Sequence, residues 1–275
     1  MLPSVEEHVI ASSINRKLSA LSSFYEFHAR HGLDLGELLV TWRPYAGART
    51  AWKPFLHHIA TQQPQRQRTI KLKTPRPMPQ VLAAEQVQAI LDACQRLRDR
   101  LLVAVLHDSG IRIGEALGLR HDDLAVAERA LTVRPRRNDN RARTKAAGSR
   151  TVPVSAELLG LYADYLEAEY GDLDSDYVFV NLWGQPLGQP LRYETVYDLV
   201  GRLRRRVGID FDPHWLRHTY ATGLLRRGTP IETVSKLLGH ASITTTIDIY
   251  GHLIPQDARR VLEAAGWLDG RRLRW

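Results

Sequence analysis

The segment DPHWLRHTYATGLLRRG, at positions 212–228, places side chains that can do chemistry at the start of an expected helix. Asp212 is a good N-cap and Pro213 suits the first helical position. His214 and Arg217 are three residues apart, so on a helix they share one face close to its N-terminus. Free N–H groups and the helix dipole favour an anion there, and an imidazole beside a guanidinium suits a phosphate oxygen. Because His-x-x-Arg also occurs on ordinary helix surfaces, the rest of the chain must decide.

A metal site is a second interpretation of the same segment, because His214 and His218 lie at i and i+4. The intervening Glu of a zincin helix is missing, and no third ligand is evident. The single cysteine, Cys94, allows no disulfide and no thiolate cluster within the chain, which fits a reducing compartment. We therefore expect no metal.

A second candidate group lies in SGIRIGEALGLR, at positions 109–120. Arg112 follows Gly110 at the start of a short expected helix, and Glu115 is three residues further on. The two side chains can form a purely structural ion pair. Alternatively, the carboxylate holds the guanidinium so that its planar fork meets a phosphate.

A third candidate group is the basic segment 134–154, which has one acid, Asp139, against seven bases: Arg134, Arg136, Arg137, Arg141, Arg143, Lys145 and Arg150. Expected strands at 130–134 and 150–154 flank a turn-forming middle, so we predict a β-hairpin with a basic tip. The tip is either a solvated loop or a hairpin that lies on DNA, with Lys145 delivering a proton.

The fourth candidate group lies in LLGHASITTTIDIYGHL, at positions 237–253. Gly239 ends one expected helix, His240 follows it, and Tyr250 lies ten residues beyond His240. The run 243–250 is β-branched and has poor helix propensity, yet we expect a helix there. The whole region also resembles a helix-turn-helix, which offers a non-enzymatic alternative, a reader of the major groove.

Hydrophobic periodicity, together with residues that typically begin or end helices and strands, predicts a mainly helical chain with a few strands. The expected strands are 130–134, 150–154 and 177–180, and the expected helices are 12–30, one within 46–62, 81–94, 99–110, 113–119, 155–170, 192–206, 214–227, 230–238 and 256–266. Between them, 61–79 has five bases, no acid and four prolines, which indicates an extended linker able to follow a phosphate backbone.

Composition favours a polyanionic partner and disfavours a membrane. The 275 residues carry a net charge of +8 and a pI near 9.8, which points first to nucleic acid. No apolar run approaches the about 20 residues that a membrane span needs. The N-terminal MLPSVEEHVIASS has acids where a signal peptide has bases, so we expect a cytosolic protein.

The order Arg…Lys…His-x-x-Arg…His…Tyr is more specific than any of its parts. It resembles the tyrosine recombinase (phage integrase) family, through GIRIGEALGLR, the Lys145-to-Arg150 spacing ahead of TVPV, PHWLRHTYAT and LLGHASITTTIDIYGHL. These pieces span roughly 110–253. The segment SSINRKLSALSSFYEFHARHG is similar, less specifically, to the last part of the family's helical core-binding domain.

The resemblance implies a set of site residues and roles for them. Tyr250 would attack the scissile phosphate and form a 3′-phosphotyrosine. Arg112 and Arg217 would bind nonbridging oxygens, and Lys145 would protonate the leaving 5′-oxygen. The implied catalytic set is Arg112, Lys145, His214, Arg217, His240 and Tyr250.

The remaining side chains have supporting roles in the same scheme. His214 would accept the tyrosine proton or hold the tyrosine, while His240 would donate to a phosphate oxygen. Glu115 would support the site from behind, and His218 would pack structurally. The expected DNA-binding residues are Arg66, Arg68, Lys71, Lys73, Arg141 and Arg143.

The resemblance also implies a fold and partners. We expect a partial helical core-binding domain at 1–65, a basic linker at 66–79, and at 80–275 an α+β catalytic domain with a small antiparallel sheet and a C-terminal helix. The implied partner is double-stranded DNA, bound by a homotetramer in which the C-terminal helix docks on its own core or on a neighbouring subunit. No metal or other cofactor is implied, and the expected location is the bacterial cytoplasm, at the nucleoid.

Three alternatives to a site-specific recombinase of integrase or transposase type remain. One is a DNA-binding regulator or an inactive recombinase fragment, and another is a type IB topoisomerase-like nicking and closing enzyme. A metal-dependent nuclease is the weakest, because the sequence shows no carboxylate cluster for a two-metal site.

Overall fold

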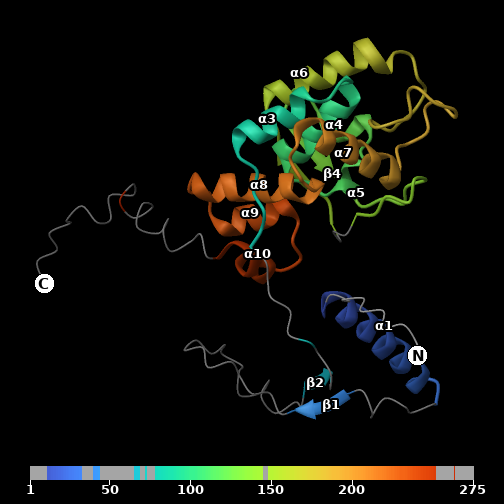
Figure 1. The fold of residues 1–275 in the computed structure, drawn as a ribbon, viewed down its shortest axis with the longest axis vertical. Coiled ribbons are helices and arrows are strands. Elements are labelled where there is room, and N and C mark those ends of the chain that lie inside the picture. Colours follow the sequence, from blue (N-terminus) through green and yellow to red (C-terminus); the bar gives the residue numbers. More distant parts are fainter. Residues whose placement is uncertain are drawn as a thin grey trace, which may run out of the picture. The chain divides into compact units, whose positions relative to one another are not determined.

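The computed structural model describes residues 11–32, 40–43, 65–68, 72, 78–144, 148–251 and 263. The chain divides into two compact units, Met1–Pro77 and Met78–Trp275, and each is treated by itself (Figure 1). In the described residues, no helix is both long enough and apolar enough to span a bilayer.

The described residues of the first unit form one long helix and one strand pair. Helix α1 (Ala11–Ala29) confirms the helix expected at 12–30. Strands β1 (Val40–Arg43) and β2 (Gln65–Arg68) pair antiparallel, with Val40 opposite Arg68. Arg66 and Arg68 therefore lie in a paired strand, at positions where the sequence analysis expects an extended basic linker. Lys71, Lys73 and the helix expected within 46–62 lie outside the described residues.

The second unit is mainly helical, as expected. Its helices are α3 (Ala84–Asp92), α4 (Leu97–Ser109), α5 (Ile113–Ala116), α6 (Ala156–Tyr165), α7 (Tyr193–Val207), α8 (Pro213–Arg226), α9 (Ile231–Leu238) and α10 (Ile243–Tyr250). A 3-10 turn, η2 (His121–Asp123), precedes the first strand, and a π-helical turn, η3 (Leu166–Tyr170), extends α6. Of the helix expected at 256–266, only Glu263 is described.

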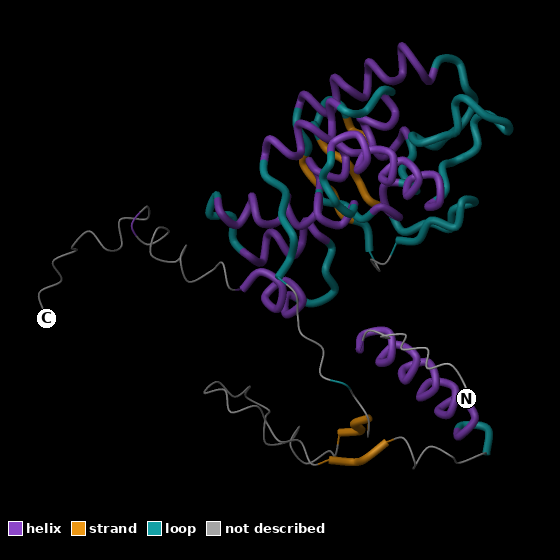
Figure 2. The backbone as a smooth tube through the Cα atoms, in the orientation of Figure 1, coloured by secondary structure: helices purple, strands orange, loops and turns teal. Residues whose placement is uncertain are grey.

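A small antiparallel sheet lies among these helices (Figure 2). Its order is β3 (Leu124–Ala125), β4 (Ala130–Val133) and β5 (Arg150–Pro153). Strands β4 and β5 are the arms of the predicted hairpin, and Leu131 pairs with Val152. The prediction of a strand at 177–180 is wrong, because this buried segment makes only isolated bridges, at Tyr177 and Val180. The two-residue β3 takes the third place in the sheet.

Buried side chains of this unit form two clusters. The larger one joins α3–α7, the sheet and the first turns of α8. The smaller one joins α8, α9 and α10, which lie together at one end of the unit in Figure 1. Its fully buried members are Ala221, Leu225, Val234, Leu238 and Tyr250. A side chain expected to react with substrate is therefore also part of a core.

Candidate active site

Helix α8 begins as the sequence predicts. The Asp212 side chain accepts a hydrogen bond from the backbone N–H of His214 at 2.8 Å, and Pro213 occupies the first turn. Such a cap is worth about 1 kcal/mol. On the first turns, His214 is exposed whereas Arg217 is buried, with 2% of its surface accessible. The two residues of the His-x-x-Arg motif thus lie at different depths.

Two neighbouring segments hold the Arg217 guanidinium in place. Its Nη1 donates to the Gly110 carbonyl at 2.7 Å, and its Nη2 donates to the Leu238 carbonyl at 2.7 Å. Burial, together with the nearby charge of Arg112, lowers the pKa of Arg217 to about 9. The group is still a cation at pH 7, so a buried positive charge is fixed where α4, α8 and α9 meet.

Gly110 makes this arrangement possible. It ends α4 with φ of +61°, a conformation that favours glycine. A Cβ there would lie 2.2 Å from Cδ1 of Tyr220, so the ring of Tyr220 packs directly on the glycine. Tyr220, on the same helix as His214 and Arg217, is held in this packing, and burial raises its pKa to about 12.

Glu115 lies between two arginines. Its side chain is 2% exposed and accepts the backbone N–H of Arg112 at 2.9 Å and Nη1 of Arg112 at 3.2 Å. Arg150 donates to the same two carboxylate oxygens, with Nη2 2.5 Å from Oε2 and Nη1 3.2 Å from Oε1. Burial raises the pKa of Glu115, but the hydrogen bond and charge of Arg150 outweigh it, so the pKa is lowered. Glu115 is therefore an anion that orients both guanidiniums.

Arg112 reaches α9 as well. Its Nη1 lies 3.4 Å from the Leu238 carbonyl, which also accepts from Arg217. The side chain is 23% exposed, so one part of the fork faces solvent while another part is held. Arg112 and Arg217, which are 105 positions apart in the sequence, are thereby gathered around one carbonyl.

His240 is held in one tautomer by its neighbours. Its Nε2 lies 3.0 Å from Nη2 of Arg217, and its Nδ1 lies 2.8 Å from Oγ1 of Thr246. Because a guanidinium can only donate, Nε2 accepts and the ring hydrogen lies on Nδ1. Burial, followed by the charges of Arg217 and Arg112, lowers the pKa of His240 to about 4. In this state Nε2 has no hydrogen for a phosphate, so the expected donor role requires Nε2 to gain a proton first.

Tyr250 lies at the end of α10, is 1% exposed and is hydrogen-bonded to a histidine. Its hydroxyl lies 2.6 Å from Nδ1 of His218. The ring of His218 in turn meets the ring of His214 edge to face, with centroids 4.4 Å apart. Burial raises the pKa of Tyr250 to about 12, while the charge of Arg217 opposes the shift. The tyrosine is thus a buried phenol hydrogen-bonded to one imidazole, which in turn contacts a second imidazole.

Two residues have closer contacts than the sequence indicates. His218 was expected to pack structurally, but it is the described side chain that is hydrogen-bonded to Tyr250. Arg150 was counted only among the bases of the hairpin, yet it binds Glu115 and, through Nε, the Leu237 carbonyl at 2.8 Å. Helical spacing from His214 marks His218, whereas nothing local in the sequence marks the contact of Arg150.

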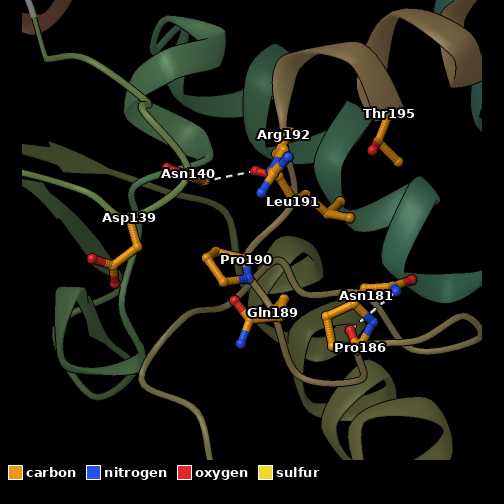
Figure 3. A pocket seen from close by; sticks show the side chains of 9 residues that line it. All are labelled: Asp139, Asn140, Asn181, Pro186, Gln189, Pro190, Leu191, Arg192 and Thr195. Atoms are coloured by element: carbon orange, nitrogen blue, oxygen red, sulfur yellow. Dashed lines mark hydrogen bonds between the residues drawn. The ribbon is translucent and has the colours of Figure 1, made fainter.

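The hairpin tip is anchored by a buried asparagine. Asn140 donates through Nδ2 to the Leu191 carbonyl at 2.7 Å and to the Leu117 carbonyl at 3.0 Å. Figure 3 shows Asn140 and Asp139 beside the segment that leads into α7, around a cavity of about 300 Å³ whose lining includes Arg192. The tip is consequently a fixed part of the unit from 134 to 144.

This anchored tip presents bases to solvent. Arg141 and Arg143 are exposed, and with Arg136 and Arg137 they line one surface hollow. The backbone at Arg143 passes close to α5, because a Cβ on Gly114 would lie 2.7 Å from the Arg143 carbonyl. Lys145, two residues further on, lies outside the described residues.

The assembled site has a positive charge excess. Arg112, Arg150 and Arg217 face the single carboxylate of Glu115. An anion placed beside Arg112 and Arg217 would offset that excess, and a phosphate matches the planar forks. The buried phenol on α10 is a side chain of a type that can act as a nucleophile. The arrangement fits covalent chemistry on a phosphodiester.

Comparison with known proteins gives a consistent picture. Residues 80–257 match the phage integrase family. Transposase A from transposon Tn554 of Staphylococcus aureus is 38% identical over 252 residues, which cover 90% of this chain and 68% of the transposase. Tyrosine recombinase XerA of Pyrococcus furiosus is 32% identical over 199 residues, which cover 72% of this chain and 65% of XerA.

Solved structures agree with these sequence relationships. A crystal structure of XerA recombinase superposes with a TM-score of 0.56 at 29% identity, covering 73% of this chain and 68% of that chain. An integrase of transposon Tn1549 in complex with a circular intermediate DNA has a TM-score of 0.63 at 19% identity, covering 94% of this chain and 81% of the integrase. The second likeness concerns the fold alone.

Proposed function

The chain belongs to the phage integrase family, and on that premise we propose that Tyr250 is the nucleophile with which it cuts and rejoins DNA. Enzymes of this family are tyrosine recombinases, which act at specific sites through a 3′-phosphotyrosine intermediate. Covalent catalysis lowers the barrier because it replaces one difficult displacement by two easier ones. Because the phosphotyrosine keeps the energy of the phosphodiester, rejoining needs no ATP.

The charged groups of the site divide the work. Arg112 and Arg217 bind the nonbridging oxygens, whose negative charge increases in the transition state. Glu115 and Arg150 hold Arg112 in register. His214, exposed at the start of α8, contacts the same phosphate. When phosphate oxygens accept the hydrogen bond from Nη2 of Arg217, Nε2 of His240 loses its partner. It can then gain a proton and donate a hydrogen bond to a phosphate oxygen.

Lys145 completes the set as the proton donor to the 5′-oxygen. The phosphate itself is held by arginines, and the scheme needs no metal ion or nucleotide. The bases of the hairpin tip, Arg141 and Arg143, bind the DNA backbone, which positions the duplex without reading its sequence. Arg66, Arg68, Lys71 and Lys73 do the same from the first unit.

The observation that carries this proposal is one group of contacts. Arg112 and Arg217 come from segments far apart in the sequence, and both are hydrogen-bonded to the short stretch that runs from Leu238 to His240. Tyr250 adjoins Arg217, whose charge lowers the pKa of the phenol against the effect of burial. A regulator that only reads operators has no need to bury a phenol beside a guanidinium cluster.

Assembly and location follow from the same chemistry. Exchange of strands between two duplexes requires four cleavages, so we propose a homotetramer on DNA, with the C-terminal segment docking on a neighbouring subunit. A type IB topoisomerase-like enzyme, by contrast, would act as a monomer. The substrate places the enzyme at the nucleoid in a bacterial cytoplasm.

A suicide DNA substrate tests the proposal. A nick close to the cleaved phosphate lets the short 5′-hydroxyl fragment diffuse away, so that the covalent complex accumulates. Because the site is unknown, a pool of fragments from the DNA that flanks the gene is used, in EDTA. Wild type and Tyr250→Phe are compared on a denaturing gel, and a native gel with the same DNA reports binding.

Each outcome has a definite meaning. A covalent adduct in wild type and none in Tyr250→Phe supports metal-free tyrosine chemistry. No adduct from wild-type protein that retains the DNA on the native gel favours the regulator. An adduct that persists in Tyr250→Phe contradicts the choice of Tyr250. DNA-dependent tetramers on the native gel separate a recombinase from a monomeric nicking and closing enzyme.

A further inference from the structure

The hydroxyl of Tyr250 already has a hydrogen-bond partner that can accept its proton. The partner is Nδ1 of His218, at 2.6 Å, in the second turn of α8. The two rings also meet edge to face, with centroids 5.7 Å apart, so the contact has both polar and packing components. His218 is half-buried, one helical turn beyond the exposed His214.

The protonation state of His218 suits acceptance of a proton. Burial, followed by the neighbouring His214 and Arg217, lowers the pKa of His218 to about 4, so its imidazole is neutral at pH 7. A neutral imidazole has one free ring lone pair. With the hydrogen on Nε2, the lone pair on Nδ1 faces the phenol. A short bond between a phenol and a neutral imidazole is the arrangement from which a proton moves as negative charge forms on oxygen.

We propose that His218, and not His214, is the general base that takes the proton of Tyr250 during cleavage. This inference rests on the proposed function, because it names the proton acceptor of that same reaction. His214 then has the other task, contact with the phosphate from the first turn of α8. The two histidines of the helix thus have different tasks: His214 contacts the phosphate, and His218 accepts the proton of the attacking phenol.

The proton transfers balance across the step. The Oη–H bond of Tyr250 breaks, its proton passes to Nδ1 of His218, and Oη forms a bond to phosphorus. The bond from phosphorus to O5′ breaks, and O5′ takes a proton from Lys145. In rejoining, a 5′-hydroxyl returns its proton to the neutral Lys145, and O5′ forms a bond to phosphorus. The bond from phosphorus to Oη breaks, and the departing phenolate recovers its proton from His218. The imidazole therefore stores one proton for the lifetime of the covalent complex.

The bound phosphate assists this storage. Before DNA binds, the cations around His218 disfavour its charged form. A phosphodiester between Arg112 and Arg217 brings negative charge to the same place, which raises the pKa of the imidazole. Acceptance of the proton is thereby favoured when substrate is present.

A merely structural contact is the competing explanation. Because Tyr250 is 1% exposed, the bond to His218 can serve only to hold the phenol in the small core formed by α8, α9 and α10. Removing the bond would then release the tyrosine and leave cleavage as fast as before, or faster. The two explanations predict opposite changes in rate.

The test uses His218→Asn with the suicide DNA in single-turnover conditions. Oδ1 of asparagine occupies nearly the position of Nδ1, so the variant keeps a hydrogen-bond acceptor but cannot take a proton at neutral pH. We expect adduct formation to slow by about 10²–10⁴-fold, the usual contribution of general base catalysis. The residual rate should rise about tenfold per pH unit between pH 6.5 and 8.5, because only the tyrosinate then reacts. His214→Asn, one turn earlier on α8, is the matched comparison and should lack this pH dependence.

A second substrate distinguishes the base from the acid. Once the cleaved position is mapped, its 5′-bridging oxygen is replaced by sulfur, which leaves without a proton. We expect this substrate to restore cleavage by Lys145→Ala but not by His218→Asn. Wild type itself should show a flat profile from pH 6.5 to 8.5, and this readout does not depend on the folding of any variant. The charged and titratable groups that act on the pair are His214, against the ring of His218, and Arg217, whose charge reaches both members.

The outcomes separate the two proposals. A slow His218→Asn variant with a rising pH profile, not restored by sulfur, supports His218 as the base. An equal or faster rate, a slow rate that is independent of pH, or restoration by sulfur overturns it. If His218→Asn fails to bind DNA, the wild-type profile decides: a flat profile supports the proposal and a tenfold rise per pH unit overturns it. The proposed function fails separately, if wild type forms no adduct or if Tyr250→Phe forms one.

Discussion

Replacement of Glu115 by Gln should destabilise the second unit more than any other isosteric change in the site. The carboxylate is 2% exposed and accepts four hydrogen bonds, three of them from the guanidiniums of Arg112 and Arg150. The amide keeps the shape but removes the charge and turns an N–H₂ group toward donors. Removing one partner of a buried ion pair costs about 3–5 kcal/mol. For a unit of this size that corresponds to a melting temperature lower by about 6–20 °C.

The pH dependence of this effect follows from the pKa of Glu115. Because the folded-state pKa is lowered, the carboxylate stabilises the fold fully above its unfolded pKa of about 4.3. That stabilisation disappears as pH falls through the folded value. The difference between wild type and Glu115→Gln should therefore be largest at pH 7 and should shrink below about pH 4.3.

Urea denaturation followed by tryptophan fluorescence measures the free energy of unfolding of both proteins at several pH values. Glu128→Gln, in an exposed turn, is the control and should lie within about 0.5 kcal/mol of wild type. A loss below about 1 kcal/mol at pH 7 would refute the view that Glu115 compensates two buried cations. So would a loss that stays constant from pH 7 to pH 3.

Three further substitutions test other contacts of the site. Thr246→Val removes the acceptor for Nδ1 of His240 and should cost about 1–3 kcal/mol in urea denaturation, whereas unchanged stability would contradict the assigned tautomer. Gly239→Ala places a Cβ 2.6 Å from Nη1 of Arg150 at φ of +64°, so we expect a loss of at least about 1 kcal/mol and slower adduct formation. A stable, fully active variant would show that Arg150 can shift freely. Asn140→Ala removes two hydrogen bonds of the hairpin tip and should speed proteolytic cleavage between 134 and 149, while an unchanged cleavage rate would argue against anchoring.

Local signals in the sequence predict most helices, because their ends carry their own chemistry. Asp212 and Pro213 start α8, and Gly110 and Gly239 end α4 and α9. Helix α10 forms although its run is β-branched, because Ser242 caps it and Thr246 and Tyr250 are buried against its neighbours. Packing of a buried face contributes more than intrinsic propensity.

The errors concern pairings that no local pattern encodes. Residues 177–180 are as apolar and buried as a strand, but strand formation depends on a neighbour elsewhere in the chain. The strand that does complete the sheet, Leu124–Ala125, is too short to give a periodic signal. Strand Gln65–Arg68 has the composition of a basic linker. Its strand character depends on a partner at Val40–Arg43, which no local pattern reveals.

The site is predicted in its residue types but not in its contacts. Motif order places Arg112, His214, Arg217, His240 and Tyr250, and their catalytic roles stay predictions until adducts are measured. The bond between His218 and Tyr250 depends on how α10 packs against α8, across 32 positions of sequence. The contact of Arg150 with Glu115 spans 35 positions and depends on the same folding.

The position of Tyr250 in a core of its own has a consequence for local opening of the fold. The cluster around α10 has five fully buried members, far fewer than the cluster around α4. Segments that bury few side chains open at lower free energy than the main core, without global unfolding. Amide hydrogens of α10 should therefore exchange with solvent before those of α4 do. Because the phenol packs in this smaller cluster, local opening of α10 would release it without unfolding of the larger core.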